Sequence, residues 1–275
     1  MGFSAMRRYL RIAFIAAAVI ASTHAAHAQA PDTVQLEDLT WTELRDAVKA
    51  GKTTAIVPIG GTEQSGPYVA LGKHNARVKV LAERIAQTLG NALVAPVIAY
   101  VPEGSYAPPT SHMRFPGTIT VPDDVFEKTL ESAANSLRIH GFKNVVFLGD
   151  HGGYQNDIKQ AVMRLNRSWA GKAHAFVPPE YYGTSSDGYA RILRQHGYRD
   201  DEIGTHAGLA DTALLLAVAP QMVRTDELRH AAKPGPADGV YGGDPRRASA
   251  ELGRLGTDAI VARTVEAIKR ATSQP

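Results

Sequence analysis

Short apolar runs alternate with amphipathic stretches along most of the chain. Continuous apolar runs are typical of buried strands, whereas apolar positions three or four residues apart are typical of helices. We expect strands at Thr54–Ile59, Ala92–Ile98, Asn144–Leu148 and Ala173–Val177. We expect helices at Ala76–Leu89, from Asp123 or Asp124 to His140, and at Tyr154–Arg167, Asp187–His196, Gly208–Val218 and Ser249–Ala271. This alternation predicts an α/β fold with three α/β/α layers around a mostly parallel sheet.

Two glycine-rich polar clusters follow predicted strands. Gly60–Gly66 comes after the first strand and Gly149–Tyr154 after the third. In a parallel sheet the ligand crevice lies beyond the carboxyl ends of the strands. Glycines there let the backbone turn sharply and present side chains to a ligand. We therefore expect the functional site at this edge of the sheet.

The first residues have the pattern of a secretory signal peptide. Three arginines at positions 7, 8 and 11 precede an apolar run over 12–22, and Ala26-His27-Ala28 fits a small-x-small cleavage site. A membrane anchor is the alternative, but a transmembrane helix needs about 20 apolar residues, more than this run offers. We expect a signal peptide at 1–28, exported by the general or the twin-arginine route. Residues 29–275 would then be a single periplasmic or secreted domain.

Charge and cysteine content narrow the possibilities further. The chain has 30 Lys and Arg against 27 Asp and Glu, and the three leader arginines account for the whole excess. Without a basic stripe we expect no nucleic-acid partner. No later segment is apolar enough to cross a membrane, so we expect no membrane contact after signal cleavage. The chain has no cysteine, so a core rather than disulfides must stabilise the exported protein.

Histidines and one glutamate stand out as candidate chemistry. His74, His151 and His206 lie in glycine-rich contexts, His112 lies close to a proline, and Glu63 follows the first strand. A carboxylate and imidazoles from separate loops make a plausible divalent metal site. A Ser-His-Asp hydrolase is the competing interpretation, but no Gly-x-Ser-x-Gly motif is present. The glycine doublets also lack the spacing and lysine of a phosphate-binding loop.

Four sequence blocks, in order, resemble the creatininase (creatinine amidohydrolase) family. The resemblance covers roughly residues 40–270, and the agreement in order and spacing carries it. The blocks are Ile56 to Pro67, Phe115-Pro116-Gly117-Thr118, Gly149-Asp150-His151-Gly152-Gly153, and Thr205-His206-Ala207-Gly208 with Asp211-Thr212.

The resemblance implies a creatininase-like three-layer fold and a homo-oligomer, commonly a hexamer. It also implies a site of two metals bridged by an aspartate. Glu63 matches the first-metal carboxylate and His151 matches its histidine. His74 stands where the bridging aspartate is expected, Ser65 where a second-metal histidine is expected, and Gly153 where some members have a second-metal glutamate.

These departures weaken the second metal position. Glu63, His74 and His151 still make a two-histidine, one-carboxylate set for one Zn or Mn ion, and we expect one metal per chain rather than two. His206 matches a histidine of the family's catalytic site and could pass a proton to the leaving nitrogen. Asp211 could add a ligand or act as a base.

The expected function is metal-dependent hydrolysis of a non-peptide or cyclic amide C–N bond in a small molecule. One alternative is a non-catalytic small-molecule binding protein on the same fold. Another is a metal-dependent enzyme with different chemistry, such as a lactone hydrolase. The expected partners are a small-molecule substrate and further copies of the chain.

Overall fold

The sheet is parallel and has four strands in the order β2-β1-β3-β4. A computed structural model describes residues 31–273, so the expected signal peptide lies outside the described residues. The strands are β1 (Thr54–Ile59), β2 (Ala92–Val94), β3 (Asn144–Gly149) and β4 (His174–Phe176). In the centre of the sheet Ile56 pairs with Val94 on one side and with Val146 on the other. The predicted α/β fold with a parallel sheet is confirmed.

The second strand is shorter than the sequence pattern predicts. Regular pairing ends at Val94 rather than at Ile98. The Ala95 N–H donates to Ile56 of β1, and the next N–H that donates to β1 comes from Ile98 rather than from Val97, so one extra residue interrupts the regular ladder. The chain nevertheless stays beside β1, because the Ile98 N–H donates to the carbonyl oxygen of Pro58 at 3.0 Å. The loop that follows therefore leaves from the same sheet edge as the loop after β1.

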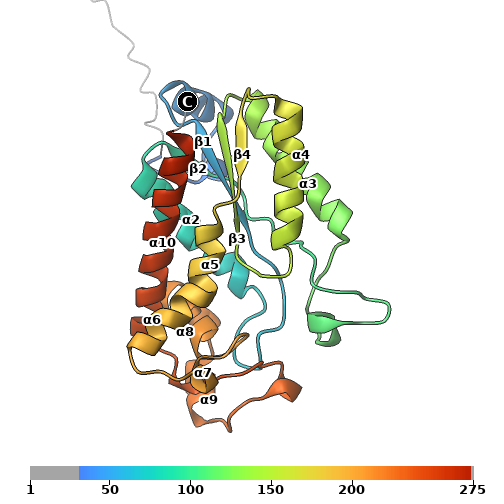
Figure 1. Cartoon of the computed structure of the whole chain (residues 1–275), viewed down its shortest axis with the longest axis vertical. Helices are drawn as coiled ribbons and strands as arrows, with labels where there is room; N and C mark the ends of the chain where they lie inside the picture. The colour runs from blue at the N-terminus through green and yellow to red at the C-terminus, as the bar shows by residue number, and fades with distance from the viewer. Residues whose placement is uncertain (1–30, 274–275) are drawn as a thin grey trace, which may run out of the picture. The chain divides into compact units, whose positions relative to one another are not determined.

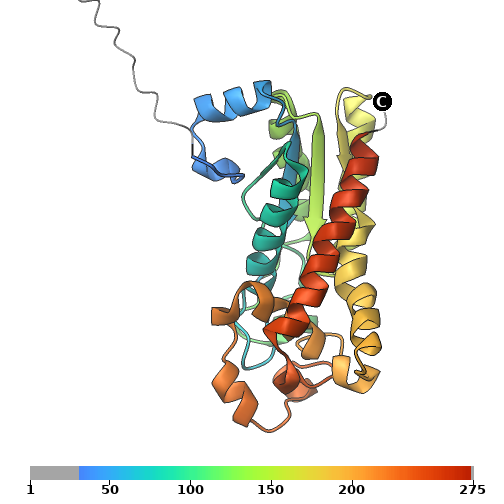
Figure 2. The same cartoon turned by 90° about the vertical axis from the view of Figure 1, so that its left-hand side faces the viewer.

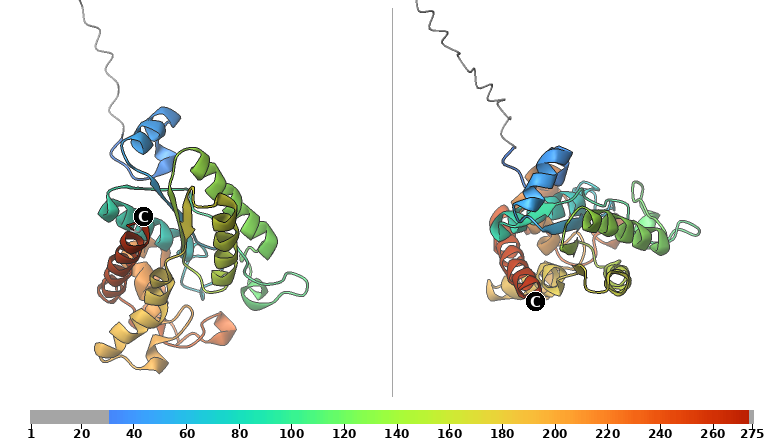
Figure 3. Two further views of the ribbon diagram at one scale, coloured as in Figure 1. Left: turned by 45° about the horizontal axis from the view of Figure 1, so that its top comes forward. Right: turned by 90° about the horizontal axis from the view of Figure 1, so that it is seen from above.

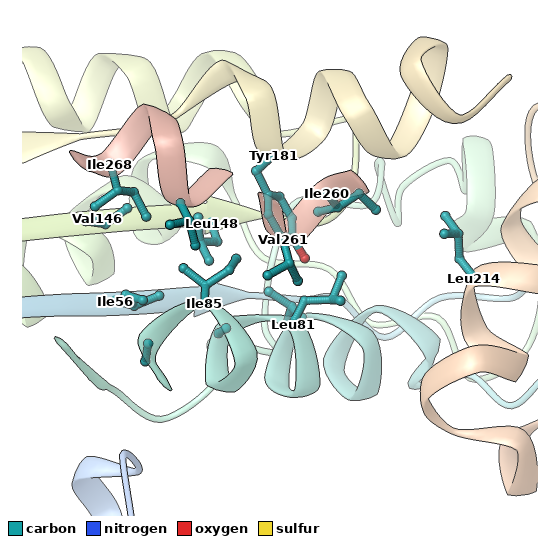
Figure 4. Packing of buried hydrophobic residues seen from close by; sticks show 14 of the residues in the cluster. Ile56, Leu81, Ile85, Val146, Leu148, Tyr181, Leu214, Ile260, Val261 and Ile268 are labelled. Carbon is teal, nitrogen blue, oxygen red and sulfur yellow. The ribbon is translucent and has the colours of Figure 1, made fainter. Parts of the chain in front are cut away.

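Helices cover both faces of the sheet, as Figure 1 and the view from above in Figure 3 show. The helices α2 (Lys73–Leu89) and α10 (Ala250–Thr272) lie on one face, and α3 (Asp123–Ile139) and α4 (Gln155–Trp169) lie on the other. Alternate side chains of the strands feed the two cores: Ile56 packs toward α2 and α10, whereas Val57 packs toward α3 and α4. Figure 4 shows the first of these cores. Strands buried on both faces explain why they read as continuous apolar runs.

The remaining helices are short. They are α1 (Trp41–Lys49), α5 (Pro179–Gly183), α6 (Tyr189–Gln195), α7 (Asp200–Ile203), α8 (Leu209–Val218) and α9 (Thr225–His230). Figure 2 shows α8 and α9 beyond the carboxyl ends of the strands. This part of the chain supplies the wall opposite the strand ends, where the candidate site lies. Among residues 31–273, no helix has the length and apolarity needed to span a membrane.

Candidate active site

Glu63 lies at the centre of the site, in the loop that follows β1. Its side chain is fully buried. Two residues earlier, Gly61 has a φ of +148°. A Cβ atom at Gly61 would lie 2.7 Å from Oε1 of Glu103, too close for any other residue without a shift. Glycine at this position lets the loop after β1 and the loop after β2 bring two carboxylates together.

One oxygen of Glu63 faces potential cations. His74 Nε2 lies 2.8 Å and Lys73 Nζ 3.3 Å from Glu63 Oε1. His206 Nδ1 lies 3.7 Å from the same oxygen. Lys73 also forms an ion pair with Asp211, on the first turn of α8. Both Lys73 and His74 come from the first turn of α2, so one helix end delivers both groups to Glu63.

A buried ion-pair network supports these groups from behind. Arg77 Nε donates to Asp150 Oδ2 at 2.9 Å, and Arg77 Nη1 donates to Asp211 Oδ1 at 2.7 Å. His74 Nδ1 lies 2.6 Å from Asp150 Oδ2, and the hydroxyl of Tyr181 donates to Asp150 Oδ1 at 2.8 Å. Asp150 thus has partners on both oxygens and fixes the ring of His74. Both ring nitrogens of His74 face carboxylates.

The second oxygen of Glu63 faces a different group. His112 Nε2 lies 3.2 Å and His151 Nε2 3.6 Å from Glu63 Oε2, while His151 Nδ1 lies 3.6 Å from Glu103 Oε2. One donor atom from each of Glu63, Glu103, His112 and His151 lies within 4.8 Å of the other three. Glu63 Oε2 and both oxygens of Glu103 are buried with no hydrogen-bond partner. Buried carboxylate oxygens normally have partners, so this donor set fits a cation.

Burial and neighbouring charge separate the pKa values of Glu103 and of the histidines around Glu63. Burial, followed by the negative charge of Glu63, raises the pKa of Glu103 to about 9. Burial lowers the pKa of His151 to about 4, against the attraction of Glu63. Burial and then the charge of Lys73 lower the pKa of His206 to about 3. These imidazoles are therefore neutral near pH 7, with a lone pair available.

Two carboxylates in the ion-pair network have lowered pKa values, in contrast to Glu103. Burial opposes ionisation of Glu63, but the positive charges of Lys73 and His74 outweigh it and hold its pKa well below the usual range. Burial likewise opposes ionisation of Asp150, but the Arg77 guanidinium and the hydrogen bond from His74 lower its pKa to about 2. Both groups are therefore charged near pH 7.

The structure brings the expected residues Glu63, His74, His151 and His206 into one cluster. Asp211 reaches that cluster through its ion pairs with lysine and arginine on α2. His74 lies outside the four-residue donor group, so its role as a metal ligand stays a prediction.

Sequence reasoning missed Glu103 and did not assign His112 to the metal. Glu103 follows β2 in the segment Val101-Pro102-Glu103-Gly104. A carboxylate between proline and glycine after a predicted strand was the available signal. His112 lies in the Ser111–Arg114 turn of the same loop, close to the Phe-Pro-Gly-Thr block.

A cavity of about 1170 Å³ opens next to the cluster. Lys73, His112, His151 and His206 line it, together with side chains from the segments around α6 to α9. The histidines stand between this space and the deeply buried Glu63. A ligand in the cavity would therefore meet imidazole and ammonium groups in front of the carboxylates.

The family model described as creatininase, creatinine amidohydrolase, matches residues 37–268. The chain belongs to the creatininase family. The crystal structure of a creatinine amidohydrolase (creatininase) superposes with a TM-score of 0.73 at 23% identity, covering 89% of this chain and 100% of that one. Related creatininase structures are described as a Zn–Zn type and as an Mn form. The family and the creatininase-like three-layer fold predicted from the sequence are thus confirmed.

Curated relatives of this creatininase-family chain differ in their reactions. The creatinine amidohydrolase of Pseudomonas putida is 25% identical over 225 residues, which cover 79% of this chain and 85% of the relative. The mycofactocin precursor peptide peptidase of Mycolicibacterium smegmatis is 28% identical over 178 residues, 63% of this chain. The chain spans 61% of the length of that peptidase. These homologues support a metal-dependent hydrolase and leave the substrate class open.

Proposed function

We propose that this chain is a hydrolase of amide C–N bonds that works with one divalent metal ion, Zn or Mn. The observation that carries the proposal is the set of three unpartnered, buried carboxylate oxygens on Glu63 and Glu103 beside two imidazoles. Leaving buried polar atoms unsatisfied is costly, and a cation would give one oxygen of each carboxylate a partner. The residues present therefore fit the metal that the family implies.

The ligand set that the distances favour is Glu63, Glu103, His112 and His151. Glu63 and His151 also belong to the set expected from the sequence. Glu103 and His112 take the place of His74, because Asp150 and Glu63 already engage both nitrogens of that ring. We therefore assign His74 a positioning role, in which it holds the Glu63 carboxylate in place.

Two positions support one metal over two. Ser65 is buried and its hydroxyl is a poor ligand for a divalent cation. At Gly153, a Cβ atom would lie 2.9 Å from Cε1 of His151. An acidic side chain at that position would have to displace the His151 ring. The sequence departure at Gly153 thus agrees with the packing around His151.

When bound, the metal would supply Lewis-acid chemistry, polarising an amide carbonyl and lowering the pKa of water. His206 is placed to carry the proton. Its Nε2 lies 3.1 Å from the carbonyl oxygen and 3.2 Å from the side-chain nitrogen of Gln64, and the tautomer that donates from Nε2 to the carbonyl oxygen leaves Nδ1 as an acceptor. We propose that Nδ1 takes a proton from the attacking water and gives it to the leaving nitrogen. Asp211 is engaged by Lys73 and Arg77, and so positions those cations rather than acting as a base.

The proposed substrate class is a non-peptide or cyclic amide of a small molecule. Short linear peptides are the second candidate, because the cavity of about 1170 Å³ exceeds the usual size of a small-molecule pocket. Two further alternatives keep the fold and change the chemistry: a lactone hydrolase, and a binding protein without catalysis. A panel of hydrolysis assays with a cyclic amide, a dipeptide amide and a lactone as substrates distinguishes these candidates.

Metal analysis of the purified chain together with that panel tests the proposal. We expect about one Zn or Mn per chain, and amide hydrolysis that stops when a chelator removes the metal. Hydrolysis of the lactone alone would favour the lactone hydrolase. A chain that binds metal but cleaves nothing would favour the binding protein. A chain without metal after metal-replete expression would contradict the proposed function.

We also propose that the chain is exported and assembles with copies of itself, with a hexamer as the assembly that the family resemblance commonly implies. The leader pattern ending at Ala28 supports export, with a mature N-terminus at or near Gln29. The family resemblance supports the oligomer. N-terminal sequencing that still finds Met1 on protein from the periplasm or medium would contradict export. Light scattering that gives a monomer mass at micromolar concentration would contradict assembly.

A further inference from the structure

We propose that Lys73 serves as the second cation of this site, so that its ammonium stands where a two-metal hydrolase would need another ion. The inference rests on the proposed function, because it assumes that one metal binds at the Glu63 Oε2 side. It goes further by assigning Lys73 to the Glu63 Oε1 side and by setting at one the number of metals that the site accepts.

The position of Lys73 relative to Glu63 carries the first step. Glu63 Oε2 faces the donor group that contains His112 and His151, and Glu63 Oε1 lies 3.3 Å from Lys73 Nζ. The two oxygens of one carboxylate therefore face two different cation positions. Asp211 closes the second position from the other side by pairing with the same ammonium. Lys73 thus occupies a space that two carboxylates line.

The charges of the buried groups agree with one metal only. Four carboxylates gather here: Glu63, Glu103, Asp150 and Asp211. Lys73, Arg77 and His74, whose two ring nitrogens both face carboxylates, supply three positive charges, which leaves one negative charge once all four acids are ionised. One divalent ion beside neutral His112, His151 and His206 leaves one positive charge. A second divalent ion would leave the buried cluster with an excess of three positive charges, which a low-dielectric site does not tolerate.

Lys73 lies at a position in α2 where a positive charge is unfavourable unless carboxylates pair with it. Lys73 is the first residue of α2 and is 2% exposed. The first turn of a helix carries partial positive charge and disfavours a cation. A buried lysine also needs paired carboxylates to remain charged. Pairing with Glu63 and Asp211 offsets both the helix dipole and the cost of burial. These contacts use two of the three ammonium N–H groups, so one N–H remains.

That remaining N–H has a place to act, because Lys73 lines the cavity beside His206. During amide hydrolysis, negative charge develops on the carbonyl oxygen of the substrate. A fixed ammonium next to the reacting carbonyl would stabilise that charge without reorganisation. Lys73 would then supply the electrostatic contribution of a second metal.

Counting bound metal in lysine variants tests this directly. The probes are Mn²⁺ or Zn²⁺ alone, at millimolar concentration, followed by metal analysis of the desalted chain. We expect one metal in the wild-type chain. In Lys73→Ala, a second ion can bind between Glu63 Oε1, Asp211 and His206, so the content should rise to two. Lys73→Arg keeps the charge and should hold one. Lys73→Ala combined with Asp211→Asn loses a ligand and should return to one.

The outcomes separate the two proposals. Two metals in the wild-type chain would overturn the role of Lys73 and leave metal-dependent hydrolysis intact. A folded Lys73→Ala variant that still binds one metal would also overturn it. No metal in the wild-type chain would overturn the proposed function and this inference together. If Lys73→Ala does not fold, Lys73→Ser takes its place, with the same expected increase to two metals and the same contradiction if only one binds.

Discussion

The two oxygens of Glu63 face surroundings of opposite character. Around Oε1, Lys73 and His74 have carboxylate partners and Arg77 links the acids behind them. Around Oε2, imidazoles lie at 3.2 and 3.6 Å without a hydrogen bond to that oxygen, and both oxygens of Glu103 lack a partner. The polar groups around Oε1 are satisfied within the chain. Those around Oε2 are satisfied only when a ligand binds.

This difference separates groups that hold the fold from groups that hold a cation. A fully paired buried network is costly to break, but it needs no ion or ligand from solution to satisfy its polar groups. A half-satisfied group of buried acceptors destabilises the chain on its own and becomes favourable when a cation binds. Substitutions on the Oε1 side should therefore affect the free energy of unfolding first. Substitutions on the Oε2 side should affect metal binding first.

Asp150→Asn should give the largest loss of stability. The variant removes the charge that Arg77 and His74 both contact, and breaking a buried pair typically costs about 3–5 kcal/mol. Chemical denaturation monitored by circular dichroism measures the loss. Tyr181→Phe is the matched control, because it removes one neutral hydrogen bond to the same carboxylate and should cost about 1 kcal/mol. Equal losses in the two variants would contradict the assigned importance of the ion pairs.

Glu103→Gln should separate metal binding from stability. The side chain keeps its size, but the site loses an anionic ligand, so metal affinity should fall by at least about 10- to 100-fold. The metal-free variant should be as stable as the metal-free wild-type chain or more stable, because neither oxygen of Glu103 has a partner to lose. Calorimetric metal titration and denaturation with chelator measure the two effects. Unchanged affinity would remove Glu103 from the ligand set.

Acid should weaken the Oε1 side through Asp150. Its pKa is depressed to about 2 in the folded chain against about 3.9 when unfolded, so the unfolded chain binds the proton first. The stabilisation is fully present above about pH 4 and is lost as the pH falls toward 2, by about 2 kcal/mol. Denaturation at pH 5, 4 and 3 in wild type and Asp150→Asn isolates this contribution. A variant with the wild-type pH dependence would contradict it.

Ser65→Ala should have the smallest effect. The Ser65 hydroxyl is buried without a hydrogen-bond partner, so its removal costs no interaction. Metal content should stay at one per chain, and the midpoint of unfolding should stay unchanged or rise slightly. A loss of bound metal after this substitution would place Ser65 in the ligand set and contradict the assignment of a single metal to the Glu63 Oε2 side.

The fold followed from the sequence to a large extent, because its signals are local. The apolar runs at Thr54–Ile59 and Asn144–Leu148 lie in the two central strands, β1 and β3, and the helix that starts at Asp123 ends at Ile139, one residue before the predicted end at His140. The second strand was predicted too long, because an apolar run does not show the extra residue between Ala95 and Ile98 that interrupts the ladder with β1.

The site followed less completely, since it depends on contacts between distant segments. Glu63 and His151 were identified from glycine-rich strand ends. Glu103 was missed because its significance lies in its distance to Glu63, which no spacing along the chain reveals. Lys73 directly precedes His74 in the sequence, but its burial against Asp211 becomes visible only when α2 meets α8. Sequence patterns thus located the site, and packing determined which side chains fill it.

The central claim is that one cation binds at the Glu63 Oε2 side while Lys73 fills the other. X-ray diffraction at the zinc absorption edge, from crystals of the wild-type chain loaded with Zn²⁺, tests it most directly. We predict one anomalous peak per chain, about 2.0–2.2 Å from donor atoms of Glu63, Glu103, His112 and His151, with Lys73 Nζ still against Glu63 Oε1. Two peaks per chain, a peak bound to His74, or no peak at this cluster would contradict the account.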